Sequence, residues 1–233
     1  MTIDRPIKSA DDCMIDIHSV NHVVSPGGEP LQILQDVSLQ IVRGESAAIV
    51  GKSGSGKTTL LGLMAGLDVP TSGAIYLDGE QINTLSEDER AKLRADRVGF
   101  VFQSFQLLPS LTALENVLLP LELAGIDYAK QQAMELLEQV GLGNRLQHTP
   151  RQLSGGEQQR VAIARAFAVT PRVLFADEPT GNLDTQTGAQ ITDLLMTLNQ
   201  QQGTTLVMVT HDDQLAERCD KQFQIDAGRV KTS

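Results

Sequence analysis

Aromatic residues and cysteines are scarce in this chain. Phe, Tyr and Trp make up 3% of its 233 residues, with two Tyr and no Trp. Only Cys13 and Cys219 occur, far apart and outside any CxxC pattern. Disulfide frameworks and zinc sites need several cysteines at characteristic spacings. We therefore interpret these two residues as reduced thiols of a cytosolic protein.

Basic residues are outnumbered by acidic ones. The chain has 19 Lys and Arg against 29 Asp and Glu, which gives a formal net charge of −10. Nucleic-acid-binding proteins present a basic face, and unaided attachment to an anionic membrane needs basic clusters. Neither function is favoured here.

Long apolar runs are also lacking. No run approaches the ~18 residues that are needed to span a bilayer. The N-terminal residues, MTIDRPIKSADD, are polar and acidic, unlike a signal peptide. Any role at a membrane would therefore depend on a partner, without direct insertion of this chain.

Short apolar runs alternate with helical patterns along the chain, whose 41% hydrophobic residues suffice for one domain with a subdomain. Buried strands are predicted at residues 46–50, 74–77, 100–102, 173–176 and 206–209. This alternation predicts an α/β fold with a mainly parallel sheet. Residues 14–50 read as short strands, and residues 104–152 as an all-helical insert.

Helix boundaries are marked by local signals. Capping boxes at Ser86-x-x-Glu89 and Thr112-x-x-Glu115 predict two helix starts. Apolar residues at helical spacing predict two further helices, one with Ala133, Leu136, Leu137 and Val140 and the other with Ile191, Leu194, Leu195 and Leu198. Gly141 stands where the glycine that ends the first of these is expected.

A phosphate-binding loop, GKSGSGKT, follows the strand at 46–50 and precedes a predicted helix. Its glycines allow backbone N–H groups to turn toward one anion, and the helix N-terminus adds positive potential. Lys57 would reach the β- and γ-phosphates, and the Thr58 hydroxyl would bind Mg²⁺. An ordinary Gly/Ser turn is the alternative. The expected nucleotide contacts are Gly51, Lys52, Ser53, Gly54, Ser55, Gly56, Lys57, Thr58 and Thr59.

Polar side chains stand at the ends of three other predicted strands. Asp177 would bind Mg²⁺ beside the phosphate loop, and its neighbour Glu178 would polarise the attacking water as general base. Gln103 would bind Mg²⁺ or that water through its amide oxygen, and His211 would donate a hydrogen bond to the γ-phosphate. The alternatives are a solvated Asp-Glu pair and capped strand ends.

The run LSGGEQQR at 153–160 contains a third capping box, Ser154-x-x-Glu157. A well-capped helix and nothing more is one interpretation. However, Gly155 and Gly156 are poor first-turn residues, and they expose the N–H groups of a helix start, which favours an anion. Because the chain already has one phosphate loop, this second anion site suggests a nucleotide that another copy of the chain holds.

Together these motifs resemble the ATP-binding subunits of ABC (ATP-binding cassette) transporters over residues 14–231. The resemblance rests on GKSGSGKT, Gln103, LSGGEQQR, VLFADEP at 173–179, the D-loop Gly181-Asn182-Leu183-Asp184 and His211. The segments GLDVPTSG (66–73) and GFVFQSFQLLPSLTALENVLLP (99–120) are similar to the branch that contains lipoprotein-release and macrolide-exporter ATPases.

The resemblance implies a P-loop NTPase (RecA-like) core, a small antiparallel β subdomain and an inserted helical subdomain at about 104–160, after a tail at 1–13. Two chains would bind head to tail around two ATP, with Mg²⁺. Each ATP would lie between Gly51–Thr58 of one chain and Ser154, Gly155, Gly156 and Glu157 of the other, with Asp184 crossing the interface.

The implied partner is an integral-membrane permease at the cytoplasmic face of the inner membrane, on which the insert around 104–125 would dock. Its substrate would be exported or extracted from the membrane, and recognition would belong to the permease. One position departs from the family pattern, because Val24 stands where an aromatic residue usually stacks on adenine. Adenine contact would then be apolar or use His22.

Two other interpretations remain open. Soluble ABC-type ATPases of DNA repair or translation usually have two cassettes in one chain or a long coiled-coil insert, and neither is evident here. A small-molecule P-loop kinase would need a lid for an acceptor substrate, and the insert that ends in LSGGEQQR is a poor candidate. Co-purification of a permease, against ribosomes or DNA, separates the first two interpretations.

Overall fold

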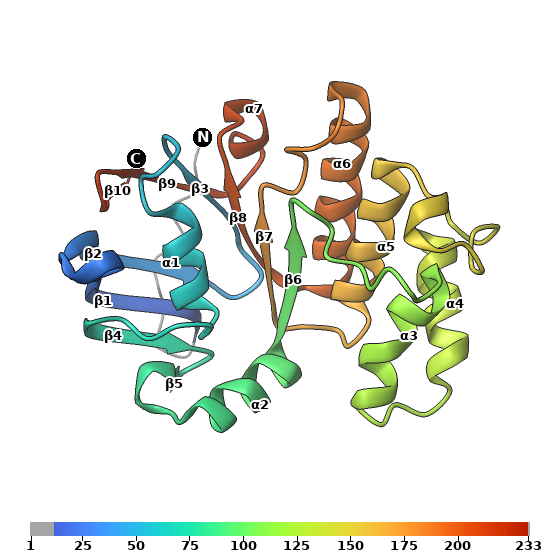
Figure 1. Ribbon diagram of the computed structural model, residues 1–233, viewed down its shortest axis with the longest axis horizontal. Coiled ribbons are helices and arrows are strands. Elements are labelled where there is room, and N and C mark those ends of the chain that lie inside the picture. The colour runs from blue at the N-terminus through green and yellow to red at the C-terminus, as the bar shows by residue number, and fades with distance from the viewer. Residues whose placement is uncertain (1–11, 233) are drawn as a thin grey trace. The chain divides into compact units, whose positions relative to one another are not determined.

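The computed structural model describes residues 12–232 and divides into two compact units. The first unit contains the described residues up to Arg94 and those from Val209 onward, and the second contains Ala95–Met208. Figure 1 shows the strands and helices of each unit. The structure confirms an α/β fold with parallel strands, an antiparallel β part and a helical part. The boundaries expected for the helical subdomain, 104–160, remain a prediction.

An antiparallel sheet forms one part of the first unit. Its strand order is β2 (Leu31–Val42), β1 (Cys13–Val24), β4 (Ser72–Leu77) and β5 (Glu80–Gln81). Apolar side chains of its strands, such as Ile17, Val37 and Ile75, are fully or almost fully buried. A tight turn at Asp78 and Gly79, both with positive φ, joins β4 to β5.

Parallel strands form the other part of the first unit. β3 (Ser46–Val50) pairs in parallel with β9 (Lys221–Asp226), which pairs antiparallel with β10 (Arg229–Thr232). The short helix α7 (Asp213–Ala216) contacts β3. β9 and β10 were not among the predicted strands, although Gln222, Phe223, Gln224 and Ile225 alternate polar and apolar residues as a half-buried strand does.

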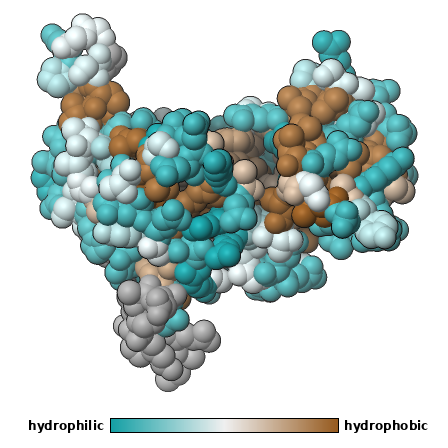
Figure 2. Space-filling model, turned by 90° about the horizontal axis from the view of Figure 1, so that it is seen from below, coloured by the Kyte–Doolittle hydropathy of each residue, from teal (hydrophilic) through white to brown (hydrophobic). Residues whose placement is uncertain are grey.

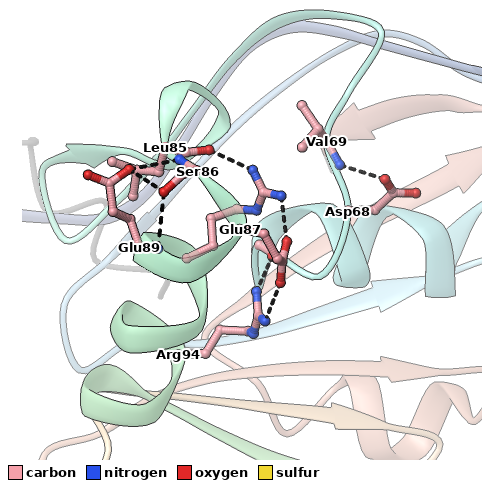
Figure 3. Close-up of polar contacts among 9 residues, drawn as sticks. Asp68, Val69, Leu85, Ser86, Glu87, Glu89 and Arg94 are labelled. Carbon is pink, nitrogen blue, oxygen red and sulfur yellow. Dashed lines mark hydrogen bonds and ion pairs between the residues drawn. The ribbon is translucent and has the colours of Figure 1, made fainter.

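Helix α2 (Glu87–Arg97) begins at the predicted capping box. Ser86 Oγ and Glu89 exchange hydrogen bonds across the first turn, as Figure 3 shows. Arg90 and Arg94 both bind the Glu87 carboxylate, and Arg94 also donates to the Gly66 carbonyl at 2.5 Å. The hydrogen bonds from Arg94 and Arg90 to its carboxylate lower the pKa of Glu87. The bond from Arg94 to Gly66 connects α2 with the segment that follows α1 (Lys57–Met64).

Three neighbouring strands have the order β8 (Thr205–Thr210), β7 (Val173–Asp177) and β6 (Val98–Phe102), and the second unit contains all of them except the last two residues of β8. β6 and β7 run parallel, with Phe102 opposite Asp177. The side chains of β7 from Val173 to Ala176 are fully buried, as expected for a strand covered on both faces.

Helices make up the rest of the second unit. They are α3 (Ala113–Leu123), α4 (Ala129–Gln139), α5 (Gly155–Phe167) and α6 (Thr185–Gln202). Each of these four helices was predicted from the sequence, and the capping box at Thr112 is complete. Short 3-10 helices lie at Pro26–Gly28 and Ile82–Thr84 in the first unit and at Pro150–Gln152 in the second.

Three further predictions from the sequence can be compared with the structure. The first is the N-terminal tail, 1–13. It lies outside the described residues except for its last two, and Cys13 already begins β1. Cys13 and Cys219 are buried free thiols, and burial raises the pKa of both, that of Cys219 to about 12. Between residues 12 and 232, no helix combines the length and apolar character of a membrane span.

Asn116 on α3 organises the loop that precedes this helix. Its side chain is fully buried. Its Oδ1 accepts from Leu108 N at 2.8 Å, and its Nδ2 donates to the carbonyls of Leu108, Leu111 and Thr112 at 2.9–3.2 Å. One side chain therefore binds four backbone groups of the turn from Leu108 to Thr112, including the Leu108 N–H and the Leu111 carbonyl.

We predict that Asn116→Ala destabilises the chain by about 2–4 kcal/mol, because the loop from Leu108 to Thr112 loses the hydrogen bonds of the Asn116 amide and a cavity forms at a fully buried position. Urea unfolding measures the change. Asn116→Asp keeps an acceptor for Leu108 N but places a buried carboxylate oxygen against the carbonyls of Leu108, Leu111 and Thr112, so at neutral pH it should be at least as harmful as Asn116→Ala. Equal stability of Asn116→Ala and the unmodified chain would contradict this role of Asn116.

Candidate functional site

The phosphate loop joins β3 to α1 in the first unit. Gly54 and Gly56 have φ of 76° and 103°, which glycine adopts without a steric penalty. A Cβ on Gly56 would lie 2.8 Å from Leu34 Cδ2 and 3.1 Å from the Ile33 carbonyl oxygen. Gly56 is also the N-cap of α1 and provides no side-chain cap. The first turn of α1 therefore presents backbone N–H groups to an anion.

Two polar side chains are buried within this loop. Lys57 is 7% exposed, and its Nζ donates to the carbonyl oxygens of Gly51 at 2.8 Å and Lys52 at 2.9 Å. Ser55 Oγ is buried and has no hydrogen-bond partner among residues 12–232. A positioned ammonium and an orphaned hydroxyl are groups that a phosphate oxygen would satisfy. The loop therefore fits the predicted phosphate ligand.

The parallel pairing of β6 with β7 brings Gln103 and Glu178 together in the second unit. Because Phe102 is opposite Asp177, both residues immediately follow the carboxyl ends of neighbouring strands. A Cβ on Gly181 would lie 2.8 Å from Gln103 Nε2 and 3.1 Å from Glu178 Oε2. The amide and the carboxylate therefore both lie against the backbone of Gly181.

Glu178 has an unusual backbone conformation. Its φ is +46°, in the left-handed region, although a proline follows it. Residues before proline normally prefer extended backbone. The turn is held by a hydrogen bond from Gly181 N to the Glu178 carbonyl at 3.0 Å. Gln159 of α5, fully buried, donates from Nε2 to the Pro179 carbonyl at 2.7 Å. Strain of this kind is typical of functional sites.

The LSGGEQQR run begins helix α5, as predicted. Ser154 is the N-cap, with Glu157 N donating to its Oγ at 3.3 Å and Ser154 N donating to Glu157 Oε2 at 2.8 Å. Arg145 donates from Nε to Glu157 Oε1 at 3.0 Å. This partner was not predicted from the sequence. The hydrogen bond from Ser154 N and that from Arg145 lower the pKa of Glu157. Glu157 therefore stays ionised and fixes the helix start.

The two glycines of this run also have a packing role. A Cβ on Gly156 would lie 2.6 Å from Thr187 Cγ2, closer than side chains can approach. A Cβ on Gly155 would meet only Leu183 Cδ2 at 3.4 Å and Phe105 Cζ at 3.7 Å. Gly156 is therefore required for the close approach of α5 to the first turn of α6, a reason that the sequence alone did not provide.

Asp184 is the N-cap of α6. Its Oδ1 accepts from Gln186 N at 3.1 Å and from Thr187 N at 3.0 Å. Hydrogen bonds led by that from the Thr187 side chain lower the pKa of Asp184. This local role was missed in the sequence, although an Asp two to three residues before a helical pattern is a standard N-cap signal.

His211, Val24 and His22, three further residues of the predicted site, lie in the first unit. His211 is exposed and immediately follows β8, before Asp212 caps α7. Val24, the last residue of β1, is half-buried. His22 is 6% exposed, so its ring has little free face for stacking on a base. Of the two residues considered for adenine, Val24 is therefore the better placed.

The comparisons with known proteins agree with these motifs. A family model described as "ABC transporter" matches residues 34–181. The chain belongs to the ABC transporter ATPases. It is 56% identical over 220 residues to the uncharacterized ABC transporter ATP-binding protein YbbA of Escherichia coli K12, covering 94% of this chain and 96% of YbbA.

Other relatives of this ABC ATPase define its branch. It is 49% identical over 201 residues to LolD of Xanthomonas euvesicatoria, named as a lipoprotein-releasing system ATP-binding protein, covering 85% and 82% of the two chains. The ATP-binding cassette MJ0796, solved as a dimer in a post-hydrolysis state with ADP and Pi, has a TM-score of 0.87, 43% identity and coverage of 94% and 97%. The predicted family, fold class and ATPase class are thereby confirmed.

Gly156→Ala is predicted to destabilise this ABC ATPase by about 1–3 kcal/mol, because the new methyl group overlaps Thr187 Cγ2. Gly155→Ala is the matched control and should have little effect on the free energy of unfolding. Thr187→Ser removes the clashing methyl group, so it should restore much of the loss in the Gly156→Ala background. Equal unfolding midpoints for the two alanine variants would contradict the packing role.

Proposed function

We propose that this ABC ATPase works as a head-to-tail pair of chains that hydrolyses ATP to drive an integral-membrane permease. One observation carries the proposal. The chain has a complete phosphate loop at Gly51–Thr58 and, in its second unit, a capped helix start at Ser154 whose two glycines favour an anion. Since one phosphate loop already serves the chain's own nucleotide, the second feature is suited to the nucleotide of another copy.

Each proposed ATP is bound by residues of both chains. Backbone N–H groups and Lys57 of the phosphate loop bind the phosphates, and Val24 contacts adenine. Ser154, Gly155, Gly156 and Glu157 of the other chain contribute the capped N-terminus of α5. The dimeric MJ0796 structure, bound to ADP and Pi, supports pairing of such cassettes.

Thr58, Gln103 and Asp177 are the proposed magnesium ligands. They offer a hydroxyl, an amide oxygen and a carboxylate, which are the hard oxygen donors that Mg²⁺ prefers. Mg²⁺ would neutralise negative charge on the β- and γ-phosphates when bound. Asp177 is well suited to this role, because it is the last residue of β7 and its backbone is fixed by pairing with β6.

Glu178 is the proposed general base. Its carboxylate accepts a proton from the attacking water, and its left-handed backbone directs the side chain differently from that of Asp177. Gln103 orients the water, and His211 donates a hydrogen bond to the γ-phosphate. Asp184 links the two ATP sites across the pair, while its N-cap bonds hold the start of α6.

The permease is proposed to dock on the insert around 104–125 and on the adjoining end of α3 and α4. Leu123 and Tyr128 are 81% and 84% exposed, and Ile126 and Met134 are also exposed. A shallow hollow next to Tyr128 is lined by Met134 and by polar residues of α4. Figure 2 shows apolar surface gathered on the right, the side where Figure 1 draws these helices. Exposed apolar clusters of this kind favour a protein partner.

The relatives suggest the place and the cargo. LolD is named for a lipoprotein-releasing system. By analogy, this chain is proposed to act at the cytoplasmic face of the inner membrane, attached through the permease. The cargo would be a lipoprotein, lipid or hydrophobic compound that is exported or extracted from the membrane. Its recognition belongs to the permease.

Glu178→Gln should bind ATP, form a dimer and fail to turn over, because the amide cannot accept the proton. We expect kcat to fall by roughly 100-fold or more. Light scattering with and without ATP measures the dimer. Adding Ser154→Arg should abolish the ATP-dependent dimer, since the new side chain fills the helix start. Glu138→Gln on α4 is the control. Unchanged turnover would exclude Glu178 as the base.

Leu123→Ser combined with Tyr128→Ser should prevent capture of the permease from a detergent extract of membranes, because the apolar contact is lost. Leu67→Ser, which changes an exposed leucine of the first unit, is the matched control. ATP binding should be unchanged in all variants. Capture of ribosomes or DNA by the unmodified chain, in place of a membrane protein, would support the soluble alternative.

A further inference from the structure

Asn182 is bound to Gln103 by two reciprocal hydrogen bonds. Gln103 Nε2 donates to Asn182 Oδ1 at 3.2 Å, and Asn182 Nδ2 donates to the Gln103 backbone carbonyl at 2.9 Å. The two residues are far apart in sequence and both lie in the second unit. One side chain of the loop 181–184 therefore binds both the backbone and the side chain of Gln103.

This pairing distinguishes the two ends of the Gln103 amide. The nitrogen is engaged with Asn182, so the oxygen is the end directed to other partners. Only the oxygen can bind Mg²⁺ or accept a hydrogen bond from a water molecule. An unpaired glutamine would rotate between both orientations and present the wrong atom part of the time.

Gly181 provides the space for this arrangement. A Cβ at this position would lie 2.8 Å from Gln103 Nε2, 3.1 Å from Glu178 Oε2 and 3.2 Å from Gln103 Cδ. The amide of Gln103 and the carboxylate of Glu178 therefore rest against the same backbone segment that carries Asn182. A displacement of this segment would reach both groups at once.

The loop itself is anchored to two helices. Asp184, two residues after Asn182, caps α6 through Gln186 N and Thr187 N. Leu183 lies against Gly155, at the start of α5, where an added Cβ would be 3.4 Å from its Cδ2. Asn182 thus stands in a short loop whose C-terminal end, Leu183 and Asp184, lies against the first turns of α5 and α6.

We propose that Asn182 is a positioning residue, which holds the side-chain amide of Gln103 with its oxygen toward Mg²⁺ or the attacking water. The proposal rests on the proposed function of Gln103 and adds a condition to it. Gln103 presents its oxygen to Mg²⁺ or water only while the loop 181–184 stays packed against the first turns of α5 and α6. Because Asp184 in that loop is proposed to face the second chain, pairing of the chains would control the orientation of Gln103.

A double-mutant cycle tests the proposal in the full-length chain, with ATP hydrolysis as the readout. Asn182→Ala should lower kcat by roughly 10-fold, with a smaller change in the KM for ATP, and should raise the Mg²⁺ concentration needed for half-maximal rate. Asn182→Asp keeps the acceptor for Gln103 Nε2 and loses the donor, so it should fall between Asn182→Ala and the unmodified chain. In the Gln103→Ala background, Asn182→Ala should have no further effect.

A second measurement needs no catalysis. NMR of the side-chain amide of Gln103, without nucleotide or Mg²⁺, should show protection of its hydrogens from exchange, and Asn182→Ala should remove that protection. Asn116 provides a reference signal, because its amide is buried and lies outside this pair. Signals of Gln103 that do not change in Asn182→Ala would overturn the pairing.

The outcomes separate this inference from the proposed function. If Gln103→Ala hydrolyses ATP at the unmodified rate, the role proposed for Gln103 is wrong. If Gln103→Ala is impaired and Asn182→Ala lowers the rate by the same factor in both backgrounds, Gln103 keeps its role and the positioning by Asn182 is wrong. Non-additive loss together with the change in Mg²⁺ dependence supports the inference.

Discussion

The parallel pairing of β6 with β7 is the constraint on which the chemistry of the second unit depends. Its register sets Phe102 opposite Asp177, and the next residues on each strand are Gln103 and Glu178. A shift of one residue would turn every side chain of either strand to the opposite face. The buried side chains of β7 prevent such a shift, because it would bring Asp177 into the core. Core packing therefore fixes the positions of the proposed catalytic residues Gln103 and Glu178.

Helix α5 connects this strand pair with the loop after β6. Arg165 donates to the carbonyls of Gln106 at 2.7 Å and Phe105 at 3.2 Å, where both residues have positive φ. Partial burial lowers the pKa of Arg165, and it remains a cation at neutral pH. Gln159 holds the turn after Glu178 from the same helix. The helix that begins at Ser154 thus contacts the segments that follow both strands.

Much of this arrangement could be predicted from the sequence, because its signals are local. Capping boxes, glycine at the end of α4 and short apolar runs mark elements without any knowledge of the fold. The capping box predicted for Ser154 and Glu157 at the start of α5 is confirmed for that reason. The strands β9 and β10 were missed because β9 depends on pairing with β3, which is distant in sequence.

The partners of the predicted site residues could not be predicted in the same way. Arg145 binds Glu157 and Asn182 binds Gln103, yet no spacing in the chain relates these residues. The requirement for glycine at 156 comes from Thr187 on another helix. Sequence motifs suggest which residues have chemical roles, whereas tertiary contacts decide how each of them is held.

The left-handed backbone of Glu178 has a consequence for how this protein can change over time. A non-glycine residue in that region raises the free energy of the folded state by about 1 kcal/mol or more. Glycine at this position would relieve that strain, and it would also remove the carboxylate. Selection for thermal stability alone would therefore favour the loss of Glu178. With Glu178 as the proposed base, this position gives up stability for activity, and stabilising changes would have to accumulate elsewhere in the chain.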